Sequence, residues 1–279
     1  MTALQTLEDT CRQAMGALLP FDGVAPQYAW LLERWQAVAE PGEPFTPPGP
    51  EFELAYAELG FPPRMARFHR AALARLPQLL RGEIAVQQLL FDDGDVLAAF
   101  SAYQDNVFTA RLNAAVAAQV PVGAKVVELG GGTGRLTSVV LRAVGSEDYL
   151  FTDISRLFTL EAARRFGVRT ALLDIDEPHG TADAVVAGHV LHNARHIGKT
   201  LAGIHRMLSP GGRLIFTEAV RDNLVTLTSM QFLLPPPTER DWIFLTAEQW
   251  QAELTAAGFT LVATLPDASG QQMFCAEKS

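Results

Sequence analysis

The glycine-rich stretch from Val126 to Thr137 constrains the fold of this 279-residue chain more than any other segment. A short apolar run ends at Glu128, and four glycines follow within five positions. Residues 136–144 are then apolar enough to form a helix. Strand, glycine turn and helix in this order form the first unit of a doubly wound α/β sheet. Glycine suits this turn because the chain bends sharply there and a ligand can approach the backbone without meeting a Cβ atom.

The spacing of the glycines indicates which ligand the turn suits. A dinucleotide motif, G-x-G-x-x-G, needs a third glycine at position 135, which is Arg135, and one register later Thr133 replaces its second glycine. The sequence fits instead an acidic residue followed by closely spaced glycines: Glu128, Gly130, Gly131, Gly132 and Gly134. This pattern resembles the first motif of Rossmann-like methyltransferases that use S-adenosylmethionine, a cofactor with no pyrophosphate to seat on a helix N-terminus. The alternative is a glycine-rich turn that binds no ligand.

Composition and charge limit the classes of partner. The net charge of −9 argues against nucleic acid as the main partner. The sequence has no long uncharged apolar run that could span a membrane, and its first residues lack the basic start and apolar segment of a signal peptide. Two cysteines, Cys11 and Cys275, provide no disulfide framework or metal-binding spacing. We therefore expect a cytoplasmic protein, with no nucleic-acid or membrane partner, that acts on a small or protein-tethered molecule.

One segment carries charge of the opposite sign to the chain as a whole. Between Phe61 and Gly82 there are five arginines and no acidic residue: Arg64, Arg67, Arg70, Arg75 and Arg81. Such a run is either a solvated helix face or a docking surface for an acidic partner.

The pattern along the chain predicts two regions of different organisation. The first third predicts helices over 2–19, 27–39, 51–58 and 64–80, and one or two more over 95–120. Strands then alternate with helices, and the strands are expected over 125–129, 149–152, 169–173, 184–187, 213–217, 260–264 and 272–276. The sequence thus predicts an N-terminal helical lid subdomain, residues 1–118, and a Rossmann-like α/β core, residues 119–279. The core should be a doubly wound, mostly parallel seven-stranded sheet with an antiparallel terminal hairpin.

Carboxylates follow two of the predicted strands, at the edge where open α/β sheets bind ligands. Asp153 ends the second strand, where it can accept hydrogen bonds from both ribose hydroxyls of a cofactor. A helix N-cap or a loop acid is the alternative. Asp174 follows the third strand and can accept from an adenine amino group, while Ile175 can pack against the ring. A solvated turn is the alternative for this second pair.

Three histidines follow the fourth predicted strand: His189, His192 and His196. A metal site is one interpretation, but no cysteine or glutamate lies nearby in the sequence, and we expect no metal. A general base is favoured, because the pKa of histidine suits proton abstraction near neutral pH. His192 is the candidate, since Glu218 ends the neighbouring fifth strand and can orient its imidazole. The alternative for Glu218 is a solvated loop acid.

Several segments together resemble the methyltransferase domains of polyketide and nonribosomal peptide synthases, especially the carbon-methylating type. The matching segments are residues 76–91, 102–113, 127–134, 149–155, 172–176, 190–195, 208–218 and 244–250. In that family the histidine after the fourth strand and the glutamate ending the fifth form the catalytic pair, which correspond to His192 and Glu218. A tyrosine near the active-site mouth corresponds to Tyr103. The resemblance also implies cofactor contacts from Ile154 and from His189, a position where the family usually has asparagine.

The resemblance implies an S-adenosylmethionine-dependent methyltransferase of natural-product biosynthesis. The favoured reaction is methylation of the α-carbon of a β-ketoacyl thioester on an acyl or peptidyl carrier protein, which would dock near Arg64, Arg67 and Arg70. The alternatives are oxygen or nitrogen methylation of a small or carrier-bound intermediate, methylation of a free α-keto acid, and a non-catalytic fold that binds cofactor or partner. The stretch 229–242 is short relative to the family, so a different acceptor pocket is expected.

Overall fold

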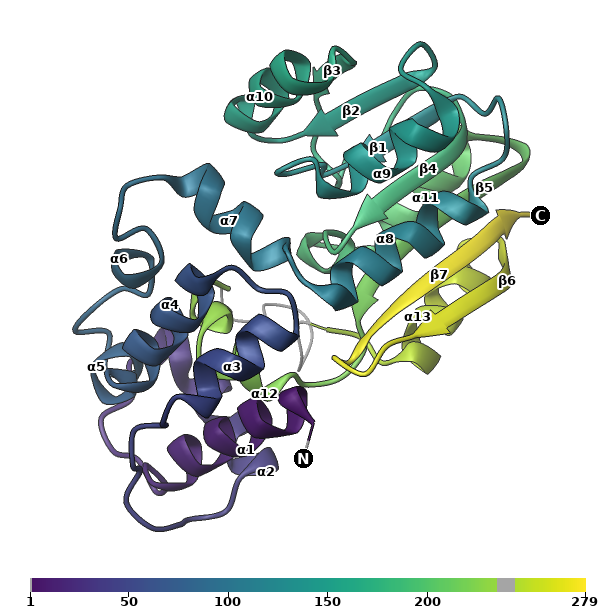
Figure 1. Ribbon diagram of the computed structural model, residues 1–279. Coiled ribbons are helices and arrows are strands. Elements are labelled where there is room, and N and C mark those ends of the chain that lie inside the picture. The colour runs from purple at the N-terminus through teal and green to yellow at the C-terminus, as the bar shows by residue number, and fades with distance from the viewer. Residues whose placement is uncertain (1, 235–243) are drawn as a thin grey trace. The chain divides into compact units, whose positions relative to one another are not determined.

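The computed structural model describes residues 2–234 and 244–279, which fold into two compact units. The first, here called the helical unit, contains residues 2–107 and 222–234 of the described chain (Figure 1). The second, the sheet unit, contains residues 108–221 and 244–279. Most of the short stretch 229–242 lies outside the described residues. None of the helices in the described chain combines the length and the apolarity that a membrane span requires.

The sheet unit is built on seven strands in the order β3-β2-β1-β4-β5-β7-β6 (Figure 1). The strands are β1 Val126–Leu129, β2 Tyr149–Asp153, β3 Arg169–Leu172, β4 Ala182–Gly188, β5 Leu208–Ala219, β6 Phe259–Pro266 and β7 Gln271–Lys278. The first five are parallel, and β7 pairs antiparallel with both β5 and β6. The strand order reverses between β1 and β4, which is the switch point where such sheets bind ligands. The predicted Rossmann-like fold class is confirmed.

Helices cover both faces of the sheet, because alternate residues of each strand point to opposite sides. Val126 packs on one face and the next residue, Val127, on the other. The helices on the Val126 face are α8 Val107–Gln119, α9 Arg135–Val144 and α10 Arg156–Phe166, and those on the Val127 face are α11 Ile197–Met207 and α13 Ala247–Ala256. The sheet therefore has a buried core on each side, as a doubly wound fold requires.

The boundary between the two units differs from the sequence-based boundary at 118/119. The structure places it at 107/108, so nearly all of α8 belongs to the sheet unit. The reason is packing: Leu112 and Val116 of α8 are buried among the core residues of the Val126 face. The structure also adds residues 222–234 to the helical unit.

The helical unit consists of short helices, as the first third of the sequence predicts. They are α1 Ala3–Gly16, α2 Ala29–Val38, α3 Glu51–Glu58, α4 Pro63–Leu73, α5 Leu76–Leu80, α6 Gln87–Leu90, α7 Val96–Gln104 and α12 Leu224–Leu227. Two 3₁₀ turns, Pro26–Tyr28 and Met230–Leu233, accompany them. The helix predicted over 64–80 is broken into α4 and α5, because Pro77 lies in the first turn of α5 and cannot continue a helix from the preceding turn.

A buried polar cluster joins the two sequence segments of the helical unit. His69 of α4 is fully buried, with its Nδ1 2.6 Å from the Tyr56 hydroxyl and its Nε2 2.8 Å from the Thr228 hydroxyl. The indole N–H of Trp35 donates to the carbonyl of Leu227, 3.1 Å away. Burial lowers the pKa of His69 to about 3, so its ring is neutral. These contacts hold residues 222–234 in the helical unit although the sheet as far as β5 precedes them in the sequence.

Candidate active site

The four glycines of the turn after β1 have different roles. A Cβ atom at Gly130 would lie 2.4 Å from Val190, one at Gly131 would lie 2.1 Å from Phe151, and one at Gly134 would lie 2.4 Å from Phe166, so close packing requires glycine at these three positions. At Gly132, where φ is +53°, a Cβ atom would meet nothing closer than 3.9 Å. The backbone at Gly132 is therefore open, and the other glycines allow the turn that exposes it.

The Glu128 carboxylate is buried within the protein. It accepts hydrogen bonds from the Thr137 hydroxyl at 2.5 Å and from the Tyr149 hydroxyl at 2.7 Å. Its residue is only 1% exposed, and this burial raises the pKa of Glu128 to about 7. The Oε2 atom thus fastens β1 to α9 and β2 on either side of the turn, and the predicted cofactor contact of Glu128 stays a prediction.

Asp153, at the end of β2, is linked to the same turn. Its Oδ2 accepts the Gly132 N–H at 2.9 Å, and its Oδ1 accepts the Ser155 N–H at 2.8 Å. Burial is the largest influence on this carboxylate and raises its pKa. The next residue, Ile154, is 72% exposed, an unusual position for a large apolar side chain at the ligand-binding edge of a sheet. The structure therefore brings Gly132, Asp153 and Ile154 together at one edge.

The two predicted residues after β3 lie in different surroundings. Asp174 is half-buried, and its Oδ1 accepts the Asp176 N–H at 2.9 Å. Ile175 is partly buried and packs against the core on the Val127 face. The Arg195 guanidinium binds Asp176 at 2.7 Å and lies 3.9 Å from Asp174. The turn at Asp174 is thus held by the Asp176 N–H and by the nearby Arg195 guanidinium, and the predicted contact of Asp174 with adenine stays a prediction.

His192 and Glu218 come together as a buried pair. Strands β4 and β5 are neighbours, and His192 lies in the 3₁₀ turn Leu191–Asn193 that follows β4. The His192 Nδ1 is 2.9 Å from the Glu218 Oε2, and the His192 backbone N–H donates to Oε1 at 3.1 Å. Burial by itself raises the pKa of Glu218, but the charges and hydrogen bonds of the histidines outweigh it, so this pKa is lowered. Glu218 is therefore an ionised, fully buried partner that fixes the orientation of the imidazole.

A second histidine contacts the same carboxylate. The His189 Nδ1 lies 3.5 Å from the Glu218 Oε2, and its ring centroid is 4.7 Å from that of His192. The Phe244 ring lies 5.9 Å from the His189 ring, at an interplanar angle of 19°, and 5.0 Å from the His192 ring. Burial lowers the pKa of His189 to about 4. The rings of the two histidines and the phenylalanine thus pack together, and both histidines contact Glu218.

The remaining predicted residues lie outside this cluster. His196 directly precedes α11 and is exposed. The ligand atoms of His189, His192 and Glu218 lie within 4.8 Å of one another, a spacing that a metal ion also accepts. That no metal binds there stays a prediction. Tyr103 lies on α7 in the helical unit, where burial raises its pKa to about 12, and its role also stays a prediction.

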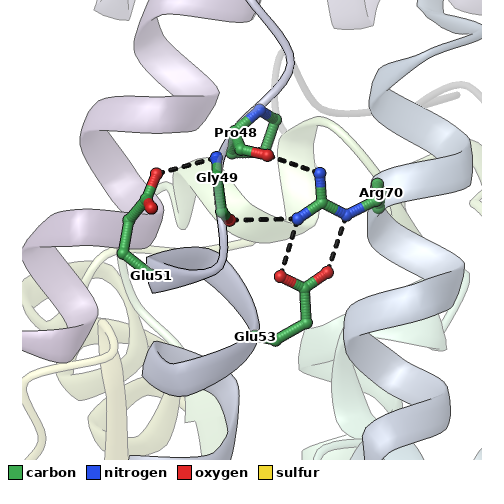
Figure 2. A network of polar contacts seen from close by, with 5 residues as sticks. All are labelled: Pro48, Gly49, Glu51, Glu53 and Arg70. Atoms are coloured by element: carbon green, nitrogen blue, oxygen red, sulfur yellow. Dashed lines mark hydrogen bonds and ion pairs between the residues drawn. The ribbon is translucent and has the colours of Figure 1, made fainter.

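The arginine-rich segment is less positive than its composition suggests. The Arg70 guanidinium donates to both carboxylate oxygens of Glu53 at 2.6 Å, and also to the carbonyls of Pro48 and Gly49 (Figure 2). Arg64 forms an ion pair with Asp93 at 3.1 Å. Arg67 is exposed, and the described part of the chain offers it no ion pair. Of the three arginines expected to dock a carrier protein, Arg64 and Arg70 are therefore already paired with carboxylates of this chain.

Three site residues were not predicted from the sequence. Thr137 and Tyr149 donate hydrogen bonds to Glu128. The sequence could have indicated both residues, because Thr137 lies in the first turn of the helix after the glycines and Tyr149 begins the strand beside β1. Phe244 had no local signal. Its place beside the histidines depends on the path of the chain after β5.

Comparisons with known proteins identify the family. A family model described as a methyltransferase domain matches residues 100–264, and the chain belongs to this methyltransferase family. The reducing polyketide synthase Preu2 of Preussia isomera is 33% identical over 205 residues, which are 66% of this chain and 9% of that protein. The chain thus spans less than a tenth of the length of the curated relatives it matches.

Two solved structures share the fold over nearly the whole chain. The CurJ carbon methyltransferase has a TM-score of 0.77 at 24% identity, covering 99% of this chain and 92% of that one. The trans-methyltransferase CalH, solved in complex with SAH, has a TM-score of 0.67 at 20% identity, covering 99% and 90%. Together with the polyketide synthase relatives, these likenesses confirm the resemblance stated from the sequence motifs.

Proposed function

We propose that the chain binds S-adenosylmethionine at the ends of β1 and β2 and transfers its methyl group to carbon. The open backbone at Gly132 supports this place for the cofactor, because the other turn glycines face side chains. Asp153 would accept from the ribose hydroxyls, and the exposed Ile154 would border the adenine together with Asp174. When bound, the cofactor supplies an electrophilic methyl group on a cationic sulfur.

The buried contact between His192 and Glu218 carries the proposed reaction. Since Glu218 is ionised, the His192 Nδ1 holds a proton directed at the carboxylate, and the lone pair stands at Nε2. That nitrogen removes a proton from the α-carbon of the acceptor. The resulting carbanion, delocalised over two carbonyl groups, would be the nucleophile to which bound S-adenosylmethionine would supply its methyl group, with the neutral thioether as the leaving group. The proton stays on His192 as an imidazolium, which the Glu218 carboxylate stabilises.

The acceptor is proposed to be a β-ketoacyl thioester on a carrier protein. Its α-carbon lies between two carbonyls and is acidic enough for a histidine base. The kinship with polyketide synthases and the fold of carbon methyltransferases support this substrate class. Because the leaving thioether is neutral, the methyl transfer itself needs little beyond positioning and exclusion of water, which the enzyme supplies in addition to the base.

The carrier is proposed to dock on the helical unit at Arg67. Arg67 lines an open groove of about 840 Å³ whose apolar side includes Phe61 and Leu54, the latter 68% exposed. The clamp that Arg70 makes with Glu53 and the Pro48 carbonyl fixes one wall of this groove (Figure 2). An exposed cation beside an apolar groove suits an acidic carrier with an apolar contact face. We propose a cytoplasmic location for the same reaction.

The second candidate function is oxygen or nitrogen methylation. The His192–Glu218 pair supports it too, because a histidine base can remove a proton from a hydroxyl or an ammonium group. A free α-keto acid acceptor would use the same base. A non-catalytic binding role is disfavoured, since an ionised carboxylate held fully buried beside an imidazole has no evident use in binding alone.

Mass analysis of the transferred methyl group separates these functions. The protein is incubated with methyl-labelled S-adenosylmethionine and a β-ketoacyl carrier, and fragments of the carrier arm locate the label. Label on the α-carbon supports the proposal. Label on oxygen or nitrogen identifies the second function, and cofactor binding without transfer to any ketide, free acid or carrier-bound acceptor favours the non-catalytic one.

A further inference from the structure

His189 has a backbone conformation that its residue type seldom adopts. Its φ is +54°, and among the described residues it is the only non-glycine residue with a positive φ. Its N–H donates to the Thr217 carbonyl at 2.9 Å, which fastens this strained position to β5 beside Glu218. A strained conformation persists where the surroundings hold it in place, and such residues cluster at functional sites. The strained backbone at His189 therefore favours a role for its side chain at this site.

The His189 imidazole faces Glu218 with an unused nitrogen. Its Nδ1 is buried without a hydrogen-bond partner in the described chain, and it lies 3.5 Å from the Glu218 Oε2, just beyond bonding distance. Contacts with the rings of His192 and Phe244 limit where the imidazole can move. A small rotation is enough to bring the Nδ1–H onto the carboxylate.

We propose that His189 is a positioning residue, a second imidazole that donates its Nδ1–H to Glu218 and holds this carboxylate against His192. The inference rests on the proposed role of His192 as the base. Glu218 then has three donors: the backbone N–H and ring of His192, and the ring of His189. A buried carboxylate with three donors stays ionised and keeps its orientation when His192 takes up the substrate proton.

The charges around the cluster allow this arrangement. The charged groups that act on His189 are Glu218 and His192, and those that act on Glu218 are the two histidines. Burial keeps His189 neutral, so it donates a hydrogen bond without competing for the proton that His192 accepts. Sharing its charge with His189 makes the Glu218 carboxylate less basic. The Nδ1 proton of His192 therefore stays on the imidazole and does not move to Glu218.

Three substitutions at position 189 test the proposal. His189→Gly tolerates the positive φ but removes the donor, so kcat should fall about tenfold or more, the loss expected for a hydrogen bond to a charged group. The acid limb of the kcat–pH profile should move to higher pH, because an unshared Glu218 stabilises the His192 imidazolium more strongly. The Kd for SAH, measured by calorimetry, should not change. His189→Asn also tolerates this backbone, keeps a donor, and should recover most of the lost kcat and the original profile.

The outcomes separate this inference from the proposed function. If His192→Ala keeps its activity, the base assignment fails and the His189 proposal fails with it. If His192→Ala is inactive but His189→Gly keeps its kcat and pH profile, only the His189 proposal is overturned. Equal losses in His189→Gly and His189→Asn would also overturn it, and a weaker Kd for SAH with unchanged kcat would make His189 a cofactor contact. If His189→Gly does not fold, His189→Asp replaces it. Asp has the size and backbone tolerance of Asn without a donor, and activity equal to that of His189→Asn contradicts the proposal.

Discussion

The backbone N–H of Gly132 donates to the Asp153 carboxylate at 2.9 Å, so the open point of the glycine turn and the acid at the end of β2 form one unit. Replacing Gly132 by Val should weaken cofactor binding, because the side chain enters the open space and strains a φ of +53°. Asp153→Ala should lose hydrogen bonds to the ribose worth about 1.5–3 kcal/mol each. Calorimetry with SAH measures both effects.

The matched control for this prediction is Gly123→Val. Gly123 also has a positive φ, +72°, and a Cβ atom there meets nothing within 4 Å, but it lies before β1 and away from the turn. The control should carry the same backbone strain and bind SAH normally. Equal affinities for the Gly132 variant, the Asp153 variant and the control would refute the cofactor site.

The His192–Glu218 pair should act as one catalytic unit. His192→Ala should lose roughly 10²–10⁴-fold in turnover, the usual contribution of a general base, while still binding SAH. Because Glu218 acts through His192, the double variant with Glu218→Gln should be little worse than His192→Ala alone. His196→Ala, at the exposed start of α11, is the control and should keep its activity. Losses that multiply in the double variant would show that the two residues act separately.

Docking of the carrier should depend on Arg67. Arg67→Glu should raise the KM for a carrier-bound substrate and leave turnover of a short thioester mimic unchanged. Added salt should reduce this difference, since exposed charges are screened over about 8–10 Å at physiological ionic strength. Arg75→Glu makes the same charge change at another exposed position and should have little effect. Arg70→Glu is unsuitable as a test, because it breaks the pair with Glu53. If mimic and carrier substrate suffer equally, Arg67 does not dock the carrier.

The stability of the protein should depend on His69 in mildly acidic solution. In the folded chain the pKa of His69 is about 3, below the ordinary 6.5, so the unfolded chain binds more protons between these values. Stability is therefore lost as the pH falls below about 6.5, by up to about 1.4 kcal/mol per pH unit from this residue. Urea unfolding at several pH values should show a shallower dependence for His69→Gln. The exposed His179→Gln is the control, and a dependence as steep in His69→Gln as in the control would contradict the prediction.

Removal of metal ions should leave the reaction unaffected. The proposed base needs only His192 and Glu218, although the spacing of these residues and His189 also suits a cation. Dialysis against a chelator followed by an assay in metal-free buffer tests this point. Activity that disappears with the chelator and returns with a divalent ion would replace the base mechanism by a metal-dependent one.

Local patterns in the sequence were sufficient for much of the fold and for the meeting of His192 and Glu218. Glycine spacing and alternating apolar runs are local signals, and the carboxyl ends of parallel strands must share an edge. The hydrogen bonds of Glu128 could not be predicted in this way, because the neighbours of a carboxylate at a strand end, such as Thr137, are set by tertiary contacts. The same reasoning read Arg70 as a free charge, since its partner Glu53 lies on another helix and ion pairing is decided by tertiary contacts.

The helical unit is assembled from two segments of the chain, and this has a consequence for biosynthesis. As the chain leaves the ribosome, α1 to α7 emerge long before Leu227 and Thr228. Until then the Trp35 indole lacks the Leu227 carbonyl and His69 lacks the Thr228 hydroxyl, their hydrogen-bond partners in the folded protein. The helical unit therefore cannot be completed until strands β1 to β5 of the sheet unit have also been synthesised. A fragment ending at residue 107 should be prone to aggregation, and adding residues 222–234 as a separate peptide should protect it.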